Sequence, residues 1–307
     1  MKIRSLFQAL AFVAVIAACT KENAPAEAPA MRKVTLSVEV NEPAGTRVGY
    51  TENEDAYRFT WTSTDKLLVL YPDDSAEGLT GLAEFLIDEI EADGKHATFT
   101  GALPEIAGKV LIVYSSRSIV DDGCGLYEVP FPGTTVTNDA PVADALAQNT
   151  FLYAYAEVGS SGNLPNVKLE HCLSYLLLKK GLKVLDNQTE YTLGSFNIYT
   201  PYSCITFELG IIYSDYPVDG FEIKGVNANG CLTNDYLIPF MPEPTAFSLS
   251  IELDDIDDTV LVEAANQPSR TYQPGIIYEV AADNEKWAPI KAEPWDDDDD
   301  DYDDDDN

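Results

Sequence analysis

The sequence predicts an all-β protein made of antiparallel β-sandwiches. Two segments, residues 34–40 and 247–253, alternate apolar and polar side chains strictly, which is typical of strands with one buried face. Dipeptides that favour tight turns recur along the chain, among them Asp93-Gly94 and Asn229-Gly230. Almost no segment shows the 3.6-residue period of an amphipathic helix. Short strands separated by frequent turns favour sandwiches over helical or α/β folds.

Other segments are expected to form further strands and one or two short helices. The remaining β-rich runs are, in chain order, residues 57–61, 67–71, 109–114, 150–158, 191–199 and 276–280. A short helix is predicted from Pro141 to Gln148, because proline suits the first turn of a helix. Residues 83–90 are compatible with either a helix or a strand.

The N-terminus is typical of an exported lipoprotein. Residues 1–18 contain a positive start and then an almost unbroken apolar run of 13 residues, which is too short to span a membrane and predicts a signal peptide. The sequence Ile16-Ala17-Ala18-Cys19 resembles the lipobox of bacterial lipoproteins, in which the cysteine thiol takes a diacylglyceryl group. The alternative is an ordinary signal peptide with an incidental cysteine. Acyl chains on Cys19 would anchor the mature protein to a membrane.

The rest of the chain divides into a tether, two domains and a tail. Residues 19–32 are rich in Ala, Pro and Glu and predict an extended tether. The polar, glycine-bearing segment at 159–163 predicts a boundary between two sandwich domains, residues 33–160 and 161–295, each of a reasonable domain size. Residues 296–307 are almost entirely Asp and predict a disordered, solvated tail.

The composition excludes several classes of function. The chain carries 52 acidic and 19 basic residues, so its formal net charge of −33 repels phosphate backbones and excludes nucleic-acid binding. Only two histidines, His96 and His171, are present, which excludes most histidine-based catalytic and metal sites. The carboxylates of the tail attract cations, but a calcium site needs a fixed geometry that a self-repelling tail lacks. We therefore expect no metal and no cofactor.

The cysteines and the carboxylates leave open alternatives. Four cysteines follow Cys19, and an exported protein can oxidise them in three complete pairings or bury them as small apolar side chains; they are Cys124, Cys172, Cys204 and Cys231. His171 and Cys172 are neighbours on a predicted strand, so their side chains point to opposite faces and cannot form a catalytic pair. Composition alone leaves a glycosidase pair open, but the sequence singles out no two of the 52 carboxylates.

Motifs spread between Cys19 and Trp295 resemble the fimbrillin (Mfa-like) family of Gram-negative surface lipoproteins. In chain order they are Thr46-Arg47 in a glycine-bearing loop, Phe59-Thr60-Trp61 followed by Asp65-Lys66 and an apolar strand, residues 150–154 before the run at 169–176, and Tyr272-x-Pro274-Gly275-x-x-Tyr278 with the later Trp295. The order and spacing of these motifs carry the resemblance, since each one alone is degenerate.

The resemblance implies two tandem transthyretin-like β-sandwiches and a non-enzymatic role as a fimbrial subunit, anchor, tip or adhesin. The implied location is the outer membrane, the cell surface or a fimbrium, and the implied partners are other fimbrial subunits or host or bacterial surface ligands. In such fimbriae a trypsin-like protease cuts after an arginine, the first strand leaves, and a partner's strand replaces it. Here residues 34–40 would be the removable strand and Arg47 the cut site. The alternative is that Arg47 is an ordinary loop arginine.

The tail departs from the pattern of the polymerising members. These need a C-terminal strand to donate, whereas the Asp run at 296–301 cannot place alternate apolar side chains in a groove. This departure favours an anchor, a tip or a non-polymerised adhesin over a stalk subunit. The alternative function is a surface glycan-binding lipoprotein that never polymerises, with Trp61, Trp287 and Trp295 available to stack on sugars.

Overall fold

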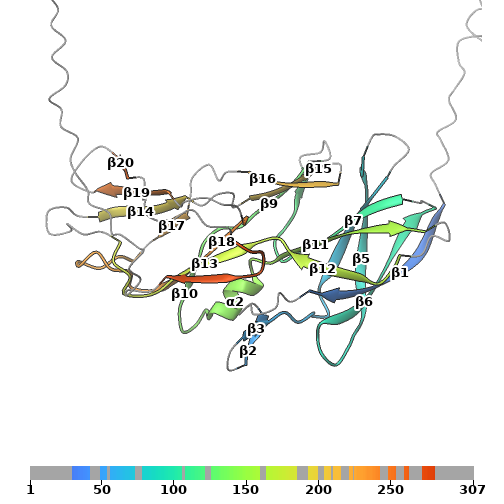
Figure 1. Cartoon of the computed structure of the whole chain (residues 1–307), viewed down its shortest axis with the longest axis horizontal. Coiled ribbons are helices and arrows are strands. Elements are labelled where there is room, and N and C mark those ends of the chain that lie inside the picture. The colour runs from blue at the N-terminus through green and yellow to red at the C-terminus, as the bar shows by residue number, and fades with distance from the viewer. Residues whose placement is uncertain are drawn as a thin grey trace, which may run out of the picture.

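The computed structural model describes most of the chain between residues 30 and 280. The described residues are 30–41, 49–53, 56–72, 78–105, 108–121, 126–159, 164–184, 193–199, 204–208, 210–215, 221–223, 225–242, 248–253, 259–262 and 272–280. Within them the molecule consists of β-strands and one short helix (Figure 1).

The elements fall into two runs along the chain. The first run is β1 (Met31–Val40), β2 (Gly49–Asn53), β3 (Ala56–Arg58), β4 (Lys66–Tyr71), β5 (Gly81–Ile90), β6 (His96–Pro104), β7 (Gly108–Ser115), β8 (Val120–Asp121), β9 (Leu126–Pro130), β10 (Thr134–Val136), α2 (Val142–Ala147), β11 (Phe151–Val158) and β12 (Val167–His171). The second run is β13 (Ser174–Leu178), β14 (Leu193–Tyr199), β15 (Cys204–Glu208), β16 (Ile211–Asp215), β17 (Phe221–Ile223), β18 (Asp235–Phe240), β19 (Ser248–Leu253), β20 (Thr259–Val262) and β21 (Ile277–Val280).

Seven strands form a sheet that closes on itself, called the closed sheet below. Its order is β1-β12-β11-β7-β4-β5-β6, and β6 pairs with β1 to complete the ring. The pairings are antiparallel except that of β1 with β12, which is parallel. The β5–β6 hairpin turns at the predicted Asp93-Gly94, where Gly94 has a φ of +72° that favours glycine.

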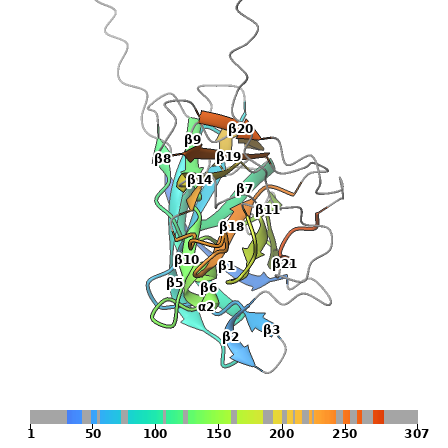
Figure 2. The ribbon, with the colours of Figure 1, turned by 90° about the vertical axis from the view of Figure 1, so that its left-hand side faces the viewer.

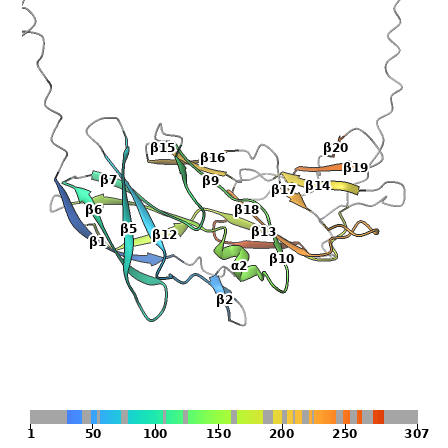
Figure 3. The ribbon, with the colours of Figure 1, turned by 180° about the vertical axis from the view of Figure 1, so that it is seen from behind.

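The other strands extend the molecule away from the closed sheet. Their sheets have the orders β16-β15-β9-β8, β10-β18-β13-β21 and β17-β14-β19-β20. The closed sheet occupies one end of the long axis and the β17-β14-β19-β20 sheet the other, with the β10-β18-β13-β21 sheet between them (Figures 1 and 3). The small β2–β3 hairpin lies beside α2 at the edge of the molecule (Figures 1 and 2).

Two apolar clusters lie on opposite faces of the same strands. The first fills the inside of the closed sheet and includes Val69 and Ile112. The second lies between the outer face of the closed sheet and strands β9, β13, β15 and β18, and it includes Leu70, Leu111 and Val113. Strands β4 and β7 are therefore buried on both faces, which explains why residues 110–113 are apolar without alternation.

The all-β class predicted from the sequence is confirmed. The predicted pair of antiparallel sandwiches is not confirmed, because the first sheet closes on itself and the pairs β1–β12 and β13–β21 are parallel. Alternation of apolar residues shows which face of a strand is buried. It does not show whether the two edge strands of a sheet meet, so closure lies beyond what the pattern predicts.

Most predicted elements are confirmed, with one correction. The strands at 34–40, 67–71, 109–114, 150–158, 247–253 and 276–280 correspond to β1, β4, β7, β11, β19 and β21, the predicted helix to α2, and the ambiguous residues 83–90 to β5. The strand predicted at 57–61 is wrong in its second half, since β3 ends at Arg58. Trp61 instead donates its backbone N–H to Gly94 O at 2.8 Å and its Nε1–H to Lys95 O at 2.9 Å, which ties this segment to the β5–β6 turn.

Strands from both sides of the predicted boundary at 160/161 share sheets. Strand β12 pairs with β1 and β11, β9 pairs with β15, and β10 pairs with β18. The division into domains at that boundary stays a prediction. No helix among the described residues is long and apolar enough to cross a membrane.

Candidate strand-exchange site

Strand β1 is held unequally on its two sides. On one side it pairs with β6 from Met31 to Glu39, opposite Pro104 to His96. On the other side it pairs with β12 only from Val38 to Val40, and one further backbone bond follows, from Asn41 N to Leu169 O at 2.7 Å. The first part of β1 is therefore held by one ladder only, and the sheet closes at its end, where β1 pairs with both neighbours.

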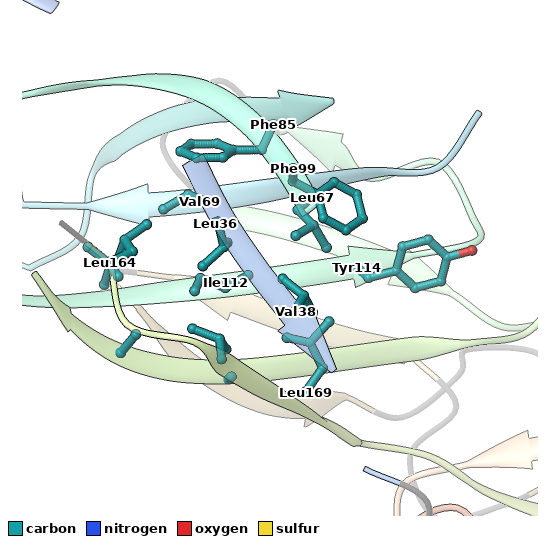
Figure 4. Close-up of a cluster of buried hydrophobic side chains, with 14 of the residues drawn as sticks. Leu36, Val38, Leu67, Val69, Phe85, Phe99, Ile112, Tyr114, Leu164 and Leu169 are labelled. Atoms are coloured by element: carbon teal, nitrogen blue, oxygen red, sulfur yellow. The ribbon is translucent and has the colours of Figure 1, made fainter. Parts of the chain in front are cut away.

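The inward face of β1 is the apolar face predicted from the sequence. Val34, Leu36, Val38 and Val40 are 0–6% exposed, while the residues between them face outward. Leu36 and Val38 point into a cluster of side chains from the rest of the closed sheet (Figure 4); those labelled around them are Leu67, Val69, Phe85, Phe99, Ile112, Tyr114, Leu164 and Leu169. Burial of four such aliphatic side chains contributes about 6–12 kcal/mol to folding. Removal of β1 without a replacement would therefore leave a destabilised, exposed groove.

A glycine on β6 shapes this groove. Gly101 pairs with Val34, and a Cβ built on Gly101 would lie 2.4 Å from Cδ2 of Phe85. Phe85 is fully buried, so its ring has no free space into which to move. The absence of a side chain at Gly101 thus lets the aromatic ring of β5 lie directly against the β6 backbone, next to β1.

Charged side chains join the end of β1 to both of its neighbours. Glu39 stands opposite His96 of β6 and Lys168 of β12. Its carboxylate lies 3.4 Å from Lys168 Nζ and 3.8 Å from His96 Nε2. The other ring nitrogen of His96, Nδ1, is 2.6 Å from Asp93 Oδ2. We call Glu39, Lys168, His96 and Asp93 the β1 clasp.

The charge states of the clasp support each other. The hydrogen bond with Asp93 raises the pKa of His96, and backbone N–H groups of Lys95 and His96, followed by the His96 ring, lower the pKa of Asp93 to about 2. Glu91, Asp93 and His96 also bring three possible metal-ligand atoms within 4.8 Å of one another, all in exposed or half-buried positions. The Asp93 carboxylate already accepts hydrogen bonds from the backbone N–H groups of Lys95 and His96 and contacts the His96 imidazole. These contacts explain the cluster as part of the β5–β6 turn, without a metal.

The two site residues predicted from the sequence lie outside the described residues. Cys19 precedes the first described residue, and Arg47 lies between the end of β1 at Val40 and the start of β2 at Gly49. Cys124, Trp287, Trp295 and the Asp tail also lie outside the described residues. Acylation of Cys19 and cleavage after Arg47 stay predictions.

His171 and Cys172 form no catalytic pair. Both are buried, at 3% and 6% exposure, and neither ring nitrogen of His171 has a hydrogen-bond partner among the described residues. The Cys172 thiol instead contacts Met241 Sδ at 3.4 Å, and burial raises its pKa to about 12, so it is not a nucleophile. Cys172 and Cys231 are both free thiols, so a complete pairing of the cysteines is not formed.

The β1 clasp is not predicted from the sequence. Glu39 belongs to a predicted strand and Asp93 to a predicted turn, but no sequence pattern indicates that both meet His96. The one available signal is His96, which follows the Asp93-Gly94 turn by two residues and therefore begins the returning strand. Lys168 is more than a hundred residues from Glu39, and its approach depends on the parallel β1–β12 pairing.

No protein-family model matches the chain, and no curated protein matches it significantly. Solved structures do match. A candidate cell adhesion protein from Bacteroides uniformis is 14% identical, with a TM-score of 0.41 over 81% of this chain and 92% of that one. A fimbrial assembly protein from Parabacteroides distasonis is 9% identical, with a TM-score of 0.39 over 82% and 91%. The tip fimbrial protein Mfa3 from Porphyromonas gingivalis is 12% identical, with a TM-score of 0.33 over 81% and 94%.

These three structural neighbours are fimbrial and cell-adhesion proteins. They are of the class that the fimbrillin resemblance of the sequence predicts. At such low identities and TM-scores, the likeness assigns no role to any residue of this chain.

Proposed function

We propose that the chain is a fimbrillin-type surface protein that acts without catalysis, in fimbrial assembly or adhesion, by exchanging strand β1. The observation that carries the proposal is the unequal pairing of β1, with a full ladder to β6 but only three paired residues on β12. A strand held in this way closes an apolar groove that another alternating strand can occupy by β-strand addition. Acylation of Cys19 would hold the precursor at the outer membrane of a Gram-negative bacterium.

Cleavage after Arg47 would turn β1 into a separable strand. Hydrolysis of the Arg47–Val48 peptide bond leaves β1 held only by its ladders, its four inward side chains and the β1 clasp. These contacts are strong enough that spontaneous dissociation of β1 is unfavourable. Exchange of β1 therefore needs an incoming strand whose apolar and polar side chains alternate in the same way.

The start of the surface-exposed chain tests this proposal. We expect the form found in assembled fibres to begin at Val48, and Arg47→Ala to keep the first strand. Arg58→Ala is the matched control, because it removes a different arginine, at the end of β3, and should leave cleavage after Arg47 unchanged. Mass spectrometry of fibres that still contain a chain starting at Cys19 would overturn the proposal. Palmitate labelling that survives Cys19→Ala would overturn the lipid anchor.

The alternative of a glycan binder that stacks sugars on aromatic rings has less support. Among the described residues, Tyr155 is the one aromatic side chain in the set of large exposed hydrophobic residues. Its ring meets Tyr153 edge-on, at an interplanar angle of 82°, and Lys109 Nζ lies 3.9 Å from its centre. These rings do not form the coplanar platform that such a binder needs.

A further inference from the structure

A groove of about 840 Å³ lies on the outer side of the closed sheet, away from the inward face of β1. The ends of β4 and β7, the segment at 116–119 and β8 line it. The polar side chains that matter below are Thr60, Asp65, Arg117, Ser118 and Asp121. Its volume is within the range of small-molecule sites.

Arg117 is a cation without a carboxylate partner among the described residues. Its Nη2 donates to Asn149 Oδ1 at 3.1 Å, and its Nε lies buried with no hydrogen-bond acceptor there. The side chain is half-buried, and burial lowers the pKa of its guanidinium. In a chain with 52 acidic and 19 basic residues, a guanidinium that meets a neutral amide instead of a carboxylate is unexpected.

The neighbours of Arg117 hold it in one position. Asn149 is fully buried and donates through Nδ2 to Thr134 Oγ1 at 3.0 Å and to Ala145 O at 2.7 Å, so its Oδ1 is fixed toward the arginine. The Ser115 hydroxyl accepts from Arg117 N at 3.1 Å and donates to Arg117 O at 2.9 Å. Both the backbone and the end of the side chain are therefore preorganised, which lowers the entropic cost of binding a ligand.

The other charges in the groove have their own partners. Lys66 Nζ lies 2.5 Å from Glu84 Oε1. Asp65 accepts from the Tyr114 hydroxyl at 3.1 Å and from Thr62 N at 2.7 Å, and burial, together with Asp65, raises the pKa of Tyr114 so that this hydroxyl stays a donor. Each Asp65 oxygen retains a lone pair for a further donor. The groove thus offers a cation for an anionic group and a carboxylate for hydroxyl donors.

We propose that this groove binds a sugar that carries a single carboxylate, such as a sialic or uronic acid. The carboxylate would pair with the Arg117 guanidinium, and ring hydroxyls would donate to Asp65 and contact Thr60 and Ser118. A phosphate or a polyanion fits less well, because Asp65, Asp121 and the net charge of −33 repel additional negative charge. This site is independent of strand exchange and would add ligand binding to it.

Titration calorimetry of the full chain with N-acetylneuraminic acid and glucuronic acid tests the proposal. We expect binding of at least one of them, weakened roughly 10- to 100-fold by Arg117→Gln, because a charge-assisted hydrogen-bond pair is lost. Arg117→Lys should weaken it as well, since lysine lacks the planar fork, while leaving the charge and the fold in place. Lys109→Gln removes the same charge outside the groove and should leave affinity unchanged.

Several outcomes would overturn the proposal. They are equal binding of glucose, unchanged affinity in Arg117→Lys and Arg117→Gln, preference for a peptide that ends in a free carboxylate, or no binding of either acidic sugar. Because the titration needs no fibre and no cleavage after Arg47, its result is separate from the fate of the strand-exchange proposal.

Discussion

The Glu39 carboxylate of β1 lies 3.4 Å from the Lys168 ammonium of β12, across the short parallel ladder that closes the sheet. The same carboxylate faces His96 on the opposite neighbour, β6. One exposed side chain therefore connects β1 to both adjacent strands, at the end of the strand that leads toward Arg47. These charged contacts lie where β1 also pairs with β12.

Glu39→Gln should loosen the end of β1 without unfolding the protein. Exposed ion pairs contribute less than about 1 kcal/mol each, so global stability should change little. Amide hydrogen exchange of Val38 and Val40 should nevertheless become faster, because opening of this end of β1 no longer has to separate the Glu39 carboxylate from Lys168 and His96. Glu84→Gln is the control, because it removes another exposed ion pair, between Glu84 on β5 and Lys66 on β4, that does not involve β1. Equal acceleration of β1 exchange in both variants would contradict a specific role for Glu39.

Leu36→Ala should destabilise the protein by about 2–5 kcal/mol, because Leu36 is fully buried inside the closed sheet and its truncation leaves a cavity. Thr35→Ala changes the neighbouring outward-facing residue and should cost less than about 1 kcal/mol. Denaturation in urea measures both. If the two variants lose equal stability, the inward face of β1 contributes less than its burial indicates.

Gly101→Ala should destabilise the protein by about 1–3 kcal/mol through overpacking against Phe85. A smaller side chain at position 85 should accept the new methyl group, so Gly101→Ala combined with Phe85→Leu should cost less than the sum of the two single changes. Denaturation of the four proteins gives the coupling free energy. Additive costs would show that the ring and the glycine do not share the space.

The sequence predicts the strands better than their arrangement. Alternation at residues 34–40 predicts which side chains of β1 are buried, and Asp93-Gly94 predicts the turn between β5 and β6. Residues 83–90 stay ambiguous in the sequence, because a short apolar run fits both the helical and the strand period. In the structure they form strand β5, because they pair with β4 and β6. Closure of the sheet depends on the contact of β1 with β12, which no local pattern encodes.

The candidate groove shows the same limit. Arg117 is one of 19 basic residues, and its sequence neighbours Ser115, Ser116 and Ser118 indicate only a loop. Its lack of a carboxylate partner among the described residues becomes visible only when Asn149, from the segment after α2, is placed against it. The absence of an ion pair is a property of the packing and leaves no trace in composition.

Stability should fall on acidification because of His171. Burial lowers the pKa of this histidine from 6.5 to about 4. Between these two values the unfolded chain takes up a proton and the folded chain does not, so the free energy of unfolding decreases as the pH falls from 6.5 to 4. The whole shift corresponds to roughly 3 kcal/mol. His171→Leu should remove this part of the pH dependence, measured by urea denaturation at a series of pH values.

His96 provides the control of opposite sign. Its pKa is raised by Asp93, so its contribution is present below pH 6.5 and is lost as the pH rises through its higher folded value. His96→Gln should therefore keep the loss of stability between pH 6.5 and 4, whereas His171→Leu should reduce it. Comparison of variants is necessary, because protonation of the many carboxylates changes stability in all of them alike. The same slope in His171→Leu and the unchanged protein would show that His171 takes up its proton in the folded state.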